Sequence, residues 1–211
     1  MSDNFDYNDL FADNIPAHPR LPIPKAKYDF GTAYPDPGSL PLEGLWQGLR
    51  KGLNREGRNL ALYPHIQGHP GLRELIAKKL RRDRQISVTS DDIVIGNGSS
   101  HLITMLFSLI LNPGDIVLTE DFFYLGTLNA LRRFKSNLIS IPTDTEGIIT
   151  DELEKTLKAL HFQGKKPKLI YIIPAYQNPL GMNLSSERRD KVIELSKQYG
   201  VPTLEDECYV D

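Results

Sequence analysis

The sequence contains a single cysteine, Cys208, among its 211 residues, so no disulfide can form within the chain. The N-terminus also lacks the basic region and apolar run of a secretory signal, because acidic residues stand at Asp3, Asp6 and Asp9. The missing disulfides and the missing signal together predict a cytoplasmic protein.

Long apolar runs and a strong net charge are missing as well. The longest apolar stretch, residues 102–111, is interrupted by Thr104 and Ser108 and falls short of the roughly 18 residues of a membrane-spanning helix. The 25 lysines and arginines nearly balance 27 acidic residues, which gives a formal charge of −2 and no long block of one sign. The sequence therefore predicts a soluble protein that binds a small molecule, with no nucleic acid and no membrane as partners.

Two local patterns point only weakly to other ligands. His65 and His69 have the spacing of two metal ligands on a helix, but Gly68 and Pro70 disfavour a helix there, so no metal site is predicted. A helix that begins at Pro70 carries a basic face, which could bind nucleic acid but is more typical of a solvent-exposed face of an amphipathic helix. The residues of this face are Arg73, Lys78, Lys79, Arg81 and Arg82.

Proline dominates the first part of the chain. Seven prolines stand between residues 16 and 41, where hydrophobic periodicity is weak. This composition favours an extended arm over packed helices. We expect residues 1–43 to form the arm and an entry segment, and residues 44–211 to form the main domain.

After residue 90, apolar segments of strand length alternate with segments of helical period. Such alternation predicts an α/β fold, with a mainly parallel sheet covered by helices on both faces. The expected strands are residues 92–96, 116–120, 138–142, 168–174 and 203–206. The expected helices are residues 100–111 and 123–134, one that begins at about residue 150, and one that runs from residue 185 or 186 to Gly200.

In an open α/β sheet, ligands bind beyond the carboxyl ends of the strands, so polar residues at those ends are candidate site residues. The first expected strand is followed by Gly98, Ser99 and Ser100 at the start of a helix. Free N–H groups and hydroxyls at a helix start can bind a phosphate, but the same residues also fit a simple serine-capped turn. From this segment alone the two interpretations are equally good.

Three further strand ends carry groups that suit an aromatic ligand. Tyr124 follows the second strand and can stack on a flat ring, although such an aromatic is more often part of a core. Asn178, before a proline, can hydrogen-bond a ligand oxygen. Asp206 ends an apolar strand, so its carboxylate needs a cationic partner, and Tyr209 can turn back toward it. Together these groups describe a pocket for a phosphorylated, basic heterocycle such as pyridoxal phosphate.

The order of these segments resembles the class I/II aminotransferases, which are pyridoxal-phosphate enzymes of fold type I, and especially their aminoadipate- and kynurenine-aminotransferase-like branch. The resemblance runs from about residue 28 to residue 211. It rests on YPDPGSLP, LYPHIQGHPGLRELIAKKL, NPGDIVLTEDFFYLGTLNAL, YIIPAYQNPLG and LEDECY, with NPLG in place of the usual NPTG.

The resemblance implies a role for each candidate residue. Gly98, Ser99 and Ser100 would hold the cofactor phosphate, and Tyr124 would stack on the pyridine ring. The ring's phenolic oxygen would receive hydrogen bonds from Asn178 and Tyr209, and Asp206 would pair with the protonated ring nitrogen. Tyr63 would reach the phosphate in the neighbouring subunit of a homodimer.

The resemblance also implies an amino-group transfer between an α-amino acid and a 2-oxo acid. The Schiff-base lysine of the family would lie beyond Asp211, so we expect this chain to lack the catalytic lysine, to form an incomplete large domain and to be inactive by itself. Two alternatives stay open: a β-lyase or decarboxylase of the same fold, and a non-enzymatic module that senses an effector.

Overall fold

The computed structural model describes residues 10–11, 27–28 and 34–210, so most of the expected arm lies outside the described residues. The chain divides into two compact units, one of residues 18–96 and one of residues 1–17 and 97–211. We describe the two units separately.

Parallel strands form the sheet of the second unit, as the sequence predicted. The strand order is β2–β1–β5–β6, so the chain moves outward from β1 to β2 and then returns to the other side of β1. The strands are β1 (Ile116–Glu120), β2 (Asn137–Ile141), β5 (Leu169–Ile172) and β6 (Thr203–Glu205).

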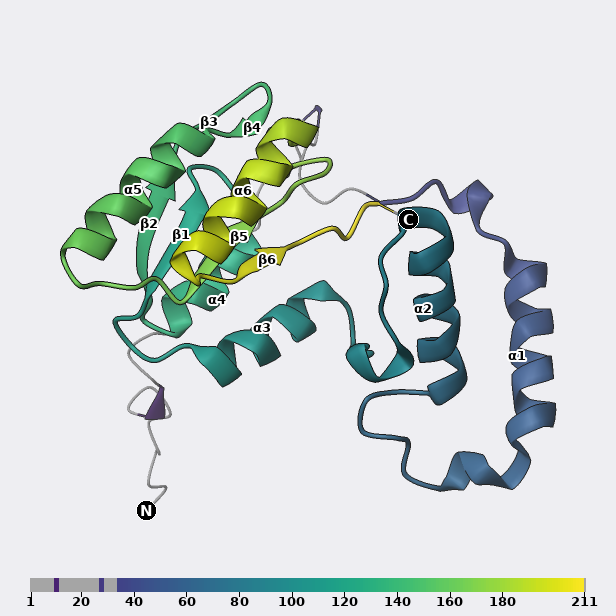
Figure 1. Ribbon diagram of the computed structural model, residues 1–211. Helices are drawn as coiled ribbons and strands as arrows, with labels where there is room; N and C mark the ends of the chain where they lie inside the picture. The colour runs from purple at the N-terminus through teal and green to yellow at the C-terminus, as the bar shows by residue number, and fades with distance from the viewer. Residues whose placement is uncertain (1–9, 12–26, 29–33, 211) are drawn as a thin grey trace, which may run out of the picture. The chain divides into compact units, whose positions relative to one another are not determined.

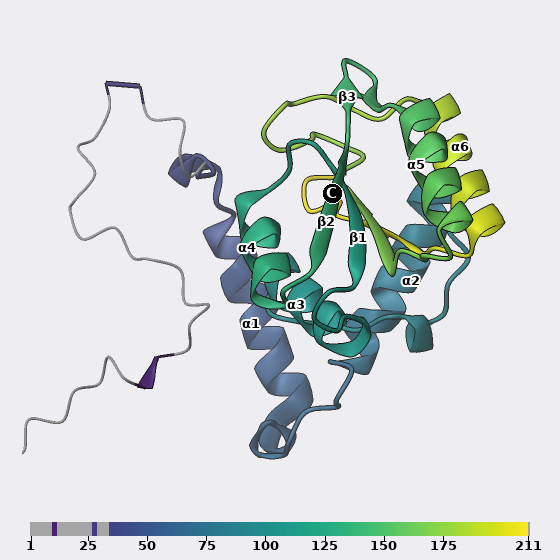
Figure 2. The same ribbon diagram turned by 90° about the vertical axis from the view of Figure 1, so that its left-hand side faces the viewer.

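Helices cover both faces of this sheet (Figures 1 and 2). Side chains alternate between the faces of a strand, so Val117 and Tyr171 enter one core cluster while Leu118 and Ile170 enter the other. The first cluster also contains Phe107 and other residues of α3 and α4, and the second contains residues of α5 and α6. The helices are α3 (Ser99–Ile110), α4 (Leu125–Arg133), α5 (Thr150–Phe162) and α6 (Ser186–Tyr199).

The ends of α6 follow local sequence signals. Ser185 precedes the helix in an extended conformation, and Glu187 lies in the first turn, where a negative charge is favourable. Gly200 ends the helix with a φ of 62°, a left-handed conformation that glycine adopts without steric cost. The helix predicted up to Gly200 is confirmed.

A short antiparallel hairpin, β3 (Thr143–Asp144) and β4 (Gly147–Ile148), precedes α5. The guanidinium of Arg188 in α6 binds Asp144 through two bonds, with Nη1–Oδ1 2.6 Å and Nη2–Oδ2 2.7 Å. Nη1 also donates to the carbonyl oxygen of Gly147 at 2.8 Å. This bidentate pair fixes the hairpin against the start of α6.

The first unit contains helices and irregular segments. The imidazole Nδ1 of His69 accepts the Leu72 N–H at 3.3 Å, and Pro70 occupies the first helical position of α2, where its missing N–H costs nothing. Both residues fix the start of that helix. The unit's elements are η2 (Pro37–Ser39), α1 (Leu42–Glu56), η3 (Gly57–Ala61), α2 (Pro70–Arg84) and η4 (Ser90–Asp92).

Two expectations for this unit were wrong. Residues 92–96 do not form a strand: the Ile95 N–H donates to Gln67 O at 2.9 Å, and no strand of the described residues pairs with the segment. Arg73 is not solvent-exposed but 4% exposed, because Nη1 donates to Ser90 O at 2.8 Å and to Gln67 Oε1 at 3.3 Å. Apolar content does not determine whether a strand finds a partner, nor does charge determine which face of a helix is covered.

No helix within the described ranges is long and apolar enough to cross a membrane.

Candidate active site

The order of the strands reverses at β1. The chain passes from β1 to β2 on one side, and it later forms β5 and then β6 on the other side. Loops after neighbouring strands then diverge and leave a crevice at the carboxyl ends of the strands. Polar residues lie at this edge in the structure. Glu120 ends β1, and Asp206 follows β6.

A cavity of about 120 Å³ lies at this edge. Its walls come from the start of α3, the β1–α4 loop, the segment after β5 and the segment after β6. The lining residues are Ser99, Ser100, Tyr124, Ile173, Asn178, Asp206, Cys208 and Tyr209. Six of the eight candidate residues therefore line one cavity, although they come from four separate segments of the chain.

Asp206 is buried, with 7% of its surface exposed, and it is held by a hydrogen-bonded pair of residues that do not line the cavity. The Tyr171 hydroxyl donates to Asp206 Oδ2 at 2.9 Å, and the Thr127 hydroxyl lies 3.1 Å from the Tyr171 oxygen. Burial raises the pKa of Tyr171, so its hydroxyl stays protonated and can donate to the carboxylate. Because the Tyr171 proton points to Asp206, Thr127 is the donor in the second bond.

No lysine, arginine or histidine of the described chain forms an ion pair with Asp206. A buried carboxylate without a cation is costly unless a ligand supplies the positive charge. The structure therefore leaves this carboxylate available to a cationic group in the cavity.

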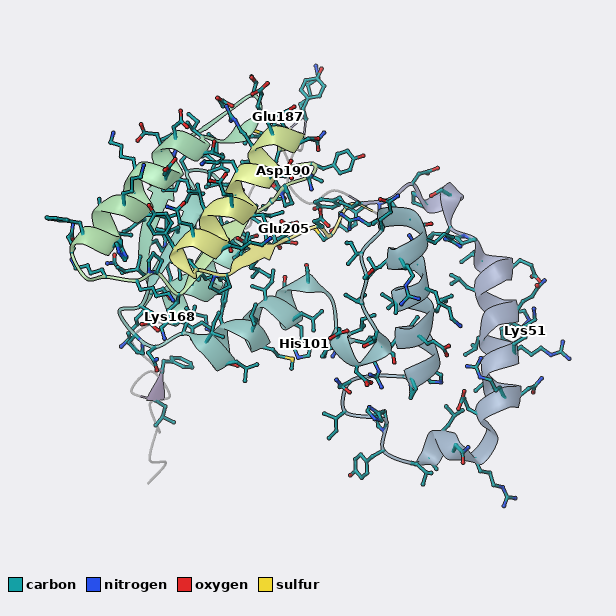
Figure 3. The ribbon with its side chains drawn as sticks, in the orientation of Figure 1. Lys51, His101, Lys168, Glu187, Asp190 and Glu205 are labelled. Atoms are coloured by element: carbon teal, nitrogen blue, oxygen red, sulfur yellow. The ribbon has the colours of Figure 1, made fainter. Side chains whose placement is uncertain are left out.

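Ser99 and Ser100 form the first turn of α3, a helix of 12 residues. The first N–H groups of a helix have no partner within the helix, and the helix dipole favours an anion there. Gly98 precedes the helix with a φ of 84°, a conformation that favours glycine, and lies outside the lining set. His101, in the same turn, accepts the Asn97 N–H on Nδ1 at 3.1 Å and so shapes the entry to the helix (Figure 3).

Tyr124 precedes the first turn of α4, and its ring lies over Gly126. A Cβ at position 126 would stand 2.8 Å from Cζ and 3.0 Å from the hydroxyl oxygen of Tyr124. Glycine is therefore required for the ring to occupy this place.

Asn178 lies in a loop that Gln177 holds together. The Gln177 side chain is 2% exposed, and its Oε1 accepts the Leu180 N–H at 2.9 Å. Its Nε2 donates to Phe122 O and, at 3.3 Å, to Glu120 Oε2. The peptide bond between Asn178 and Pro179 is cis.

Glu120 has 2% of its surface exposed, and its Oε2 also accepts the Ile173 N–H at 3.0 Å. The pKa of this carboxyl is raised to about 7, because burial and, to a smaller extent, the neighbouring Asp121 carboxylate outweigh the two hydrogen bonds that lower it. The end of β1 therefore carries a carboxyl group that titrates near neutral pH.

Cys208 lines the cavity beside Asp206. Burial and the Asp206 carboxylate raise the pKa of its thiol, so the group is a neutral thiol at neutral pH. It contributes polarizable surface and no charge to the wall.

Tyr63 lies in the other unit and is fully exposed.

The sequence analysis did not identify four residues that support the site, Tyr171, Thr127, Glu120 and Gln177. Two of them had a signal in the sequence. Tyr171 lies in the aliphatic segment LIYII, and Glu120 ends the apolar segment IVLTE, so each places a polar atom in a core.

The model of the family described as aminotransferase class I and II matches residues 32–211. The chain belongs to this family. It is 32% identical over 175 residues to the aromatic-amino-acid aminotransferase 1 of Thermococcus litoralis, which covers 83% of this chain and 42% of that protein. It therefore spans less than half the length of this curated relative.

A solved structure supports the same assignment. The kynurenine aminotransferase of Pyrococcus horikoshii, in complex with PMP, KYN and KYA, is 35% identical, with a TM-score of 0.74 over 82% of this chain and 42% of that one. The chain is also similar to a protein of another kind. An uncharacterized HTH-type transcriptional regulator of Escherichia coli, YjiR, is 32% identical over 176 residues, which are 83% of this chain and 36% of the regulator.

Class I/II aminotransferases use pyridoxal phosphate, and the cavity of this member has the chemistry to fit it. A helix start with two serines suits the phosphate, and an aromatic side chain suits the ring. The buried carboxylate of Asp206, which has no cation within the described chain, suits the protonated ring nitrogen.

Proposed function

We propose that this chain forms the cofactor cradle of an aminotransferase that moves an amino group from an α-amino acid to a 2-oxo acid. The supporting observation is the convergence of Ser99, Tyr124, Asn178 and Asp206 on one cavity at the switch in strand order. When bound, pyridoxal phosphate supplies an electron-accepting ring for chemistry at the amino acid's Cα.

Each residue has a defined task in this proposal. The N–H groups and hydroxyls of Ser99 and Ser100, preceded by Gly98, bind the phosphate. Tyr124 stacks on the ring, and Asn178 and Tyr209 hydrogen-bond its phenolic oxygen. Asp206 keeps the ring nitrogen protonated, and the Tyr171 hydroxyl holds the carboxylate in place.

No lysine is among the residues that line the cavity. We propose that this chain supplies binding and orientation, and that a lysine beyond residue 211 supplies proton transfer.

The proposal is tested with pyridoxine 5′-phosphate, which carries an alcohol in place of the aldehyde and cannot react with surface lysines. We expect saturable binding of one equivalent by isothermal titration calorimetry, with competition by pyridoxal phosphate. A flat titration, or binding that pyridoxal phosphate does not displace, would reject the cradle.

Gly126→Ala is expected to weaken ligand binding without lowering the free energy of unfolding. Alanine has the higher helix propensity, so we expect the free energy of unfolding to stay the same or rise by up to about 1 kcal/mol. The new methyl group displaces the Tyr124 ring, so the dissociation constant for pyridoxine 5′-phosphate should rise about fivefold, in line with a lost stacking contact of about 1 kcal/mol.

A matched control is Gly48→Ala in α1, where a Cβ would meet no atom within 4 Å. It should leave the dissociation constant unchanged. Unchanged binding by Gly126→Ala would show that the Tyr124 ring does not contact the ligand.

A second candidate function is effector sensing without catalysis, and the similarity to the E. coli regulator favours it. In that case the protein would bind the cofactor but support no amino transfer, and a longer form would bind DNA. An assay of 2-oxo acid formation with the longest expressed form of the protein distinguishes the two functions.

We also propose a homodimer in which Tyr63 reaches the phosphate of the neighbouring subunit. Support comes from the exposed apolar side chains of the 18–96 unit, since such patches are typical of interfaces. These side chains include Leu42, Leu45, Trp46, Leu49 and Tyr63. Analytical ultracentrifugation should give a dimer mass; a monomer at all concentrations would reject this assembly.

A further inference from the structure

Two segments of the cavity wall meet at one buried amide. The Gln177 Nε2 donates to the carbonyl oxygen of Phe122, two residues before Tyr124, and Asn178 is the next residue after Gln177. The amide therefore lies between the segment that carries the aromatic wall residue and the loop that carries the asparagine.

The side-chain oxygen and nitrogen of Gln177 both have hydrogen-bond partners. Oε1 accepts the Leu180 N–H, and Nε2 donates both to Phe122 O and to Glu120 Oε2. The backbone N–H of Gln177 also donates to Met182 O at 2.9 Å, which closes the loop on itself. A buried amide with satisfied donors and acceptor fixes its position, because any displacement leaves polar groups without partners.

Glu120 anchors the amide to the sheet. One atom, Oε2, accepts both the Gln177 side chain at 3.3 Å and the Ile173 N–H at 3.0 Å. Since Glu120 ends β1 and Ile173 follows β5, the anchor bridges the two central strands.

We propose that Gln177, held by Glu120, is a positioning residue that keeps Tyr124 and Asn178 in register across the cavity. The inference rests on the proposed cofactor site, because these two residues are assigned there to the ring and its phenolic oxygen. Gln177 and Glu120 do not line the cavity, so they act through their neighbours.

The test uses Gln177→Glu, which keeps the size of the side chain and the acceptor for Leu180 but loses at least one of the two donated bonds, because a carboxyl group has at most one proton to donate. Hydrogen exchange of the free protein is measured at residues 121–126 and 177–184. We expect exchange to become at least about tenfold faster in both segments, since they would no longer be held together. Faster exchange in only one segment, or in neither, would overturn the coupling.

Glu120 gives an independent test of the anchor. Glu120→Ala removes the acceptor and should reproduce the exchange pattern of Gln177→Glu. Glu120→Gln should restore most of the protection, because a single amide oxygen can accept both bonds that Oε2 accepts. If hydrogen exchange in Glu120→Gln is as fast as in Glu120→Ala, Glu120 does not hold Gln177 in place by accepting these two hydrogen bonds.

Binding of pyridoxine 5′-phosphate then separates this inference from the proposed function. We expect Gln177→Glu to raise the dissociation constant about tenfold, whereas the exposed control Gln163→Glu should not change it. Equal binding by wild type and Gln177→Glu would overturn the inference and leave the cradle in place. Absent binding by the wild type, with coupled exchange retained, would reject the cradle alone.

Discussion

Asp206→Ala is expected to weaken the binding of pyridoxine 5′-phosphate at least about 30-fold, since truncating one partner of a buried charge pair costs about 2–5 kcal/mol. The carboxylate is buried and has no cationic partner within the described chain, so the ligand's ring nitrogen is the group that would lose its counterion. Titration calorimetry at pH 7 measures the change.

Asp206→Asn separates charge from packing. Its amide oxygen can still accept the Tyr171 hydroxyl, so the free energy of unfolding should stay close to that of the wild type, but the neutral amide cannot stabilise a cation. The matched control is Asp190→Asn on the exposed side of α6, which should bind like the wild type (Figure 3). Wild-type affinity in Asp206→Asn would contradict the assignment of this carboxylate to the ring nitrogen.

Glu120→Gln is expected to stabilise the protein above neutral pH. The pKa of this carboxyl is raised from 4.5 to about 7, so the folded state binds the proton more tightly than the unfolded state does. The wild type therefore loses stability as pH rises from about 4.5 through about 7, by about 3 kcal/mol in total. Glutamine does not titrate, so the variant avoids this loss.

Urea denaturation at several pH values measures the difference between Glu120→Gln and the wild type. The difference in unfolding free energy should grow between pH 4.5 and 7 and be constant above that range. Glu187→Gln is the control, because Glu187 is exposed in the first turn of α6 (Figure 3). A difference that does not change with pH would show that Glu120 titrates in its ordinary range.

The sequence predicted those parts of the fold that depend on local signals. The alternation after residue 90 gave the parallel sheet and its covering helices, and Gly200 marked the end of α6 because a left-handed residue was needed there. Strand pairing is not local. The apolar residues 92–96 therefore read as a strand, although they pair with none within the described residues.

The candidate site was predictable because parallel strands end at one edge of a sheet. Tyr124, Asn178 and Asp206 could be assigned to one cavity because they follow β1, β5 and β6, whereas Ser99 was assigned through an expected strand, residues 92–96, that does not form. Their supports could not, because the bond from Tyr171 to Asp206 depends on the register of β5 with β6. Roles in cofactor binding stay predictions for all of these residues.

The most direct test of the cofactor cradle is a crystal structure of the protein with pyridoxine 5′-phosphate. The account predicts the phosphate at the N–H groups of Ser99 and Ser100, the ring against Tyr124, and the ring nitrogen within hydrogen-bond distance of Asp206. A ligand bound elsewhere, or one in the cavity with its ring nitrogen turned away from Asp206, would contradict it.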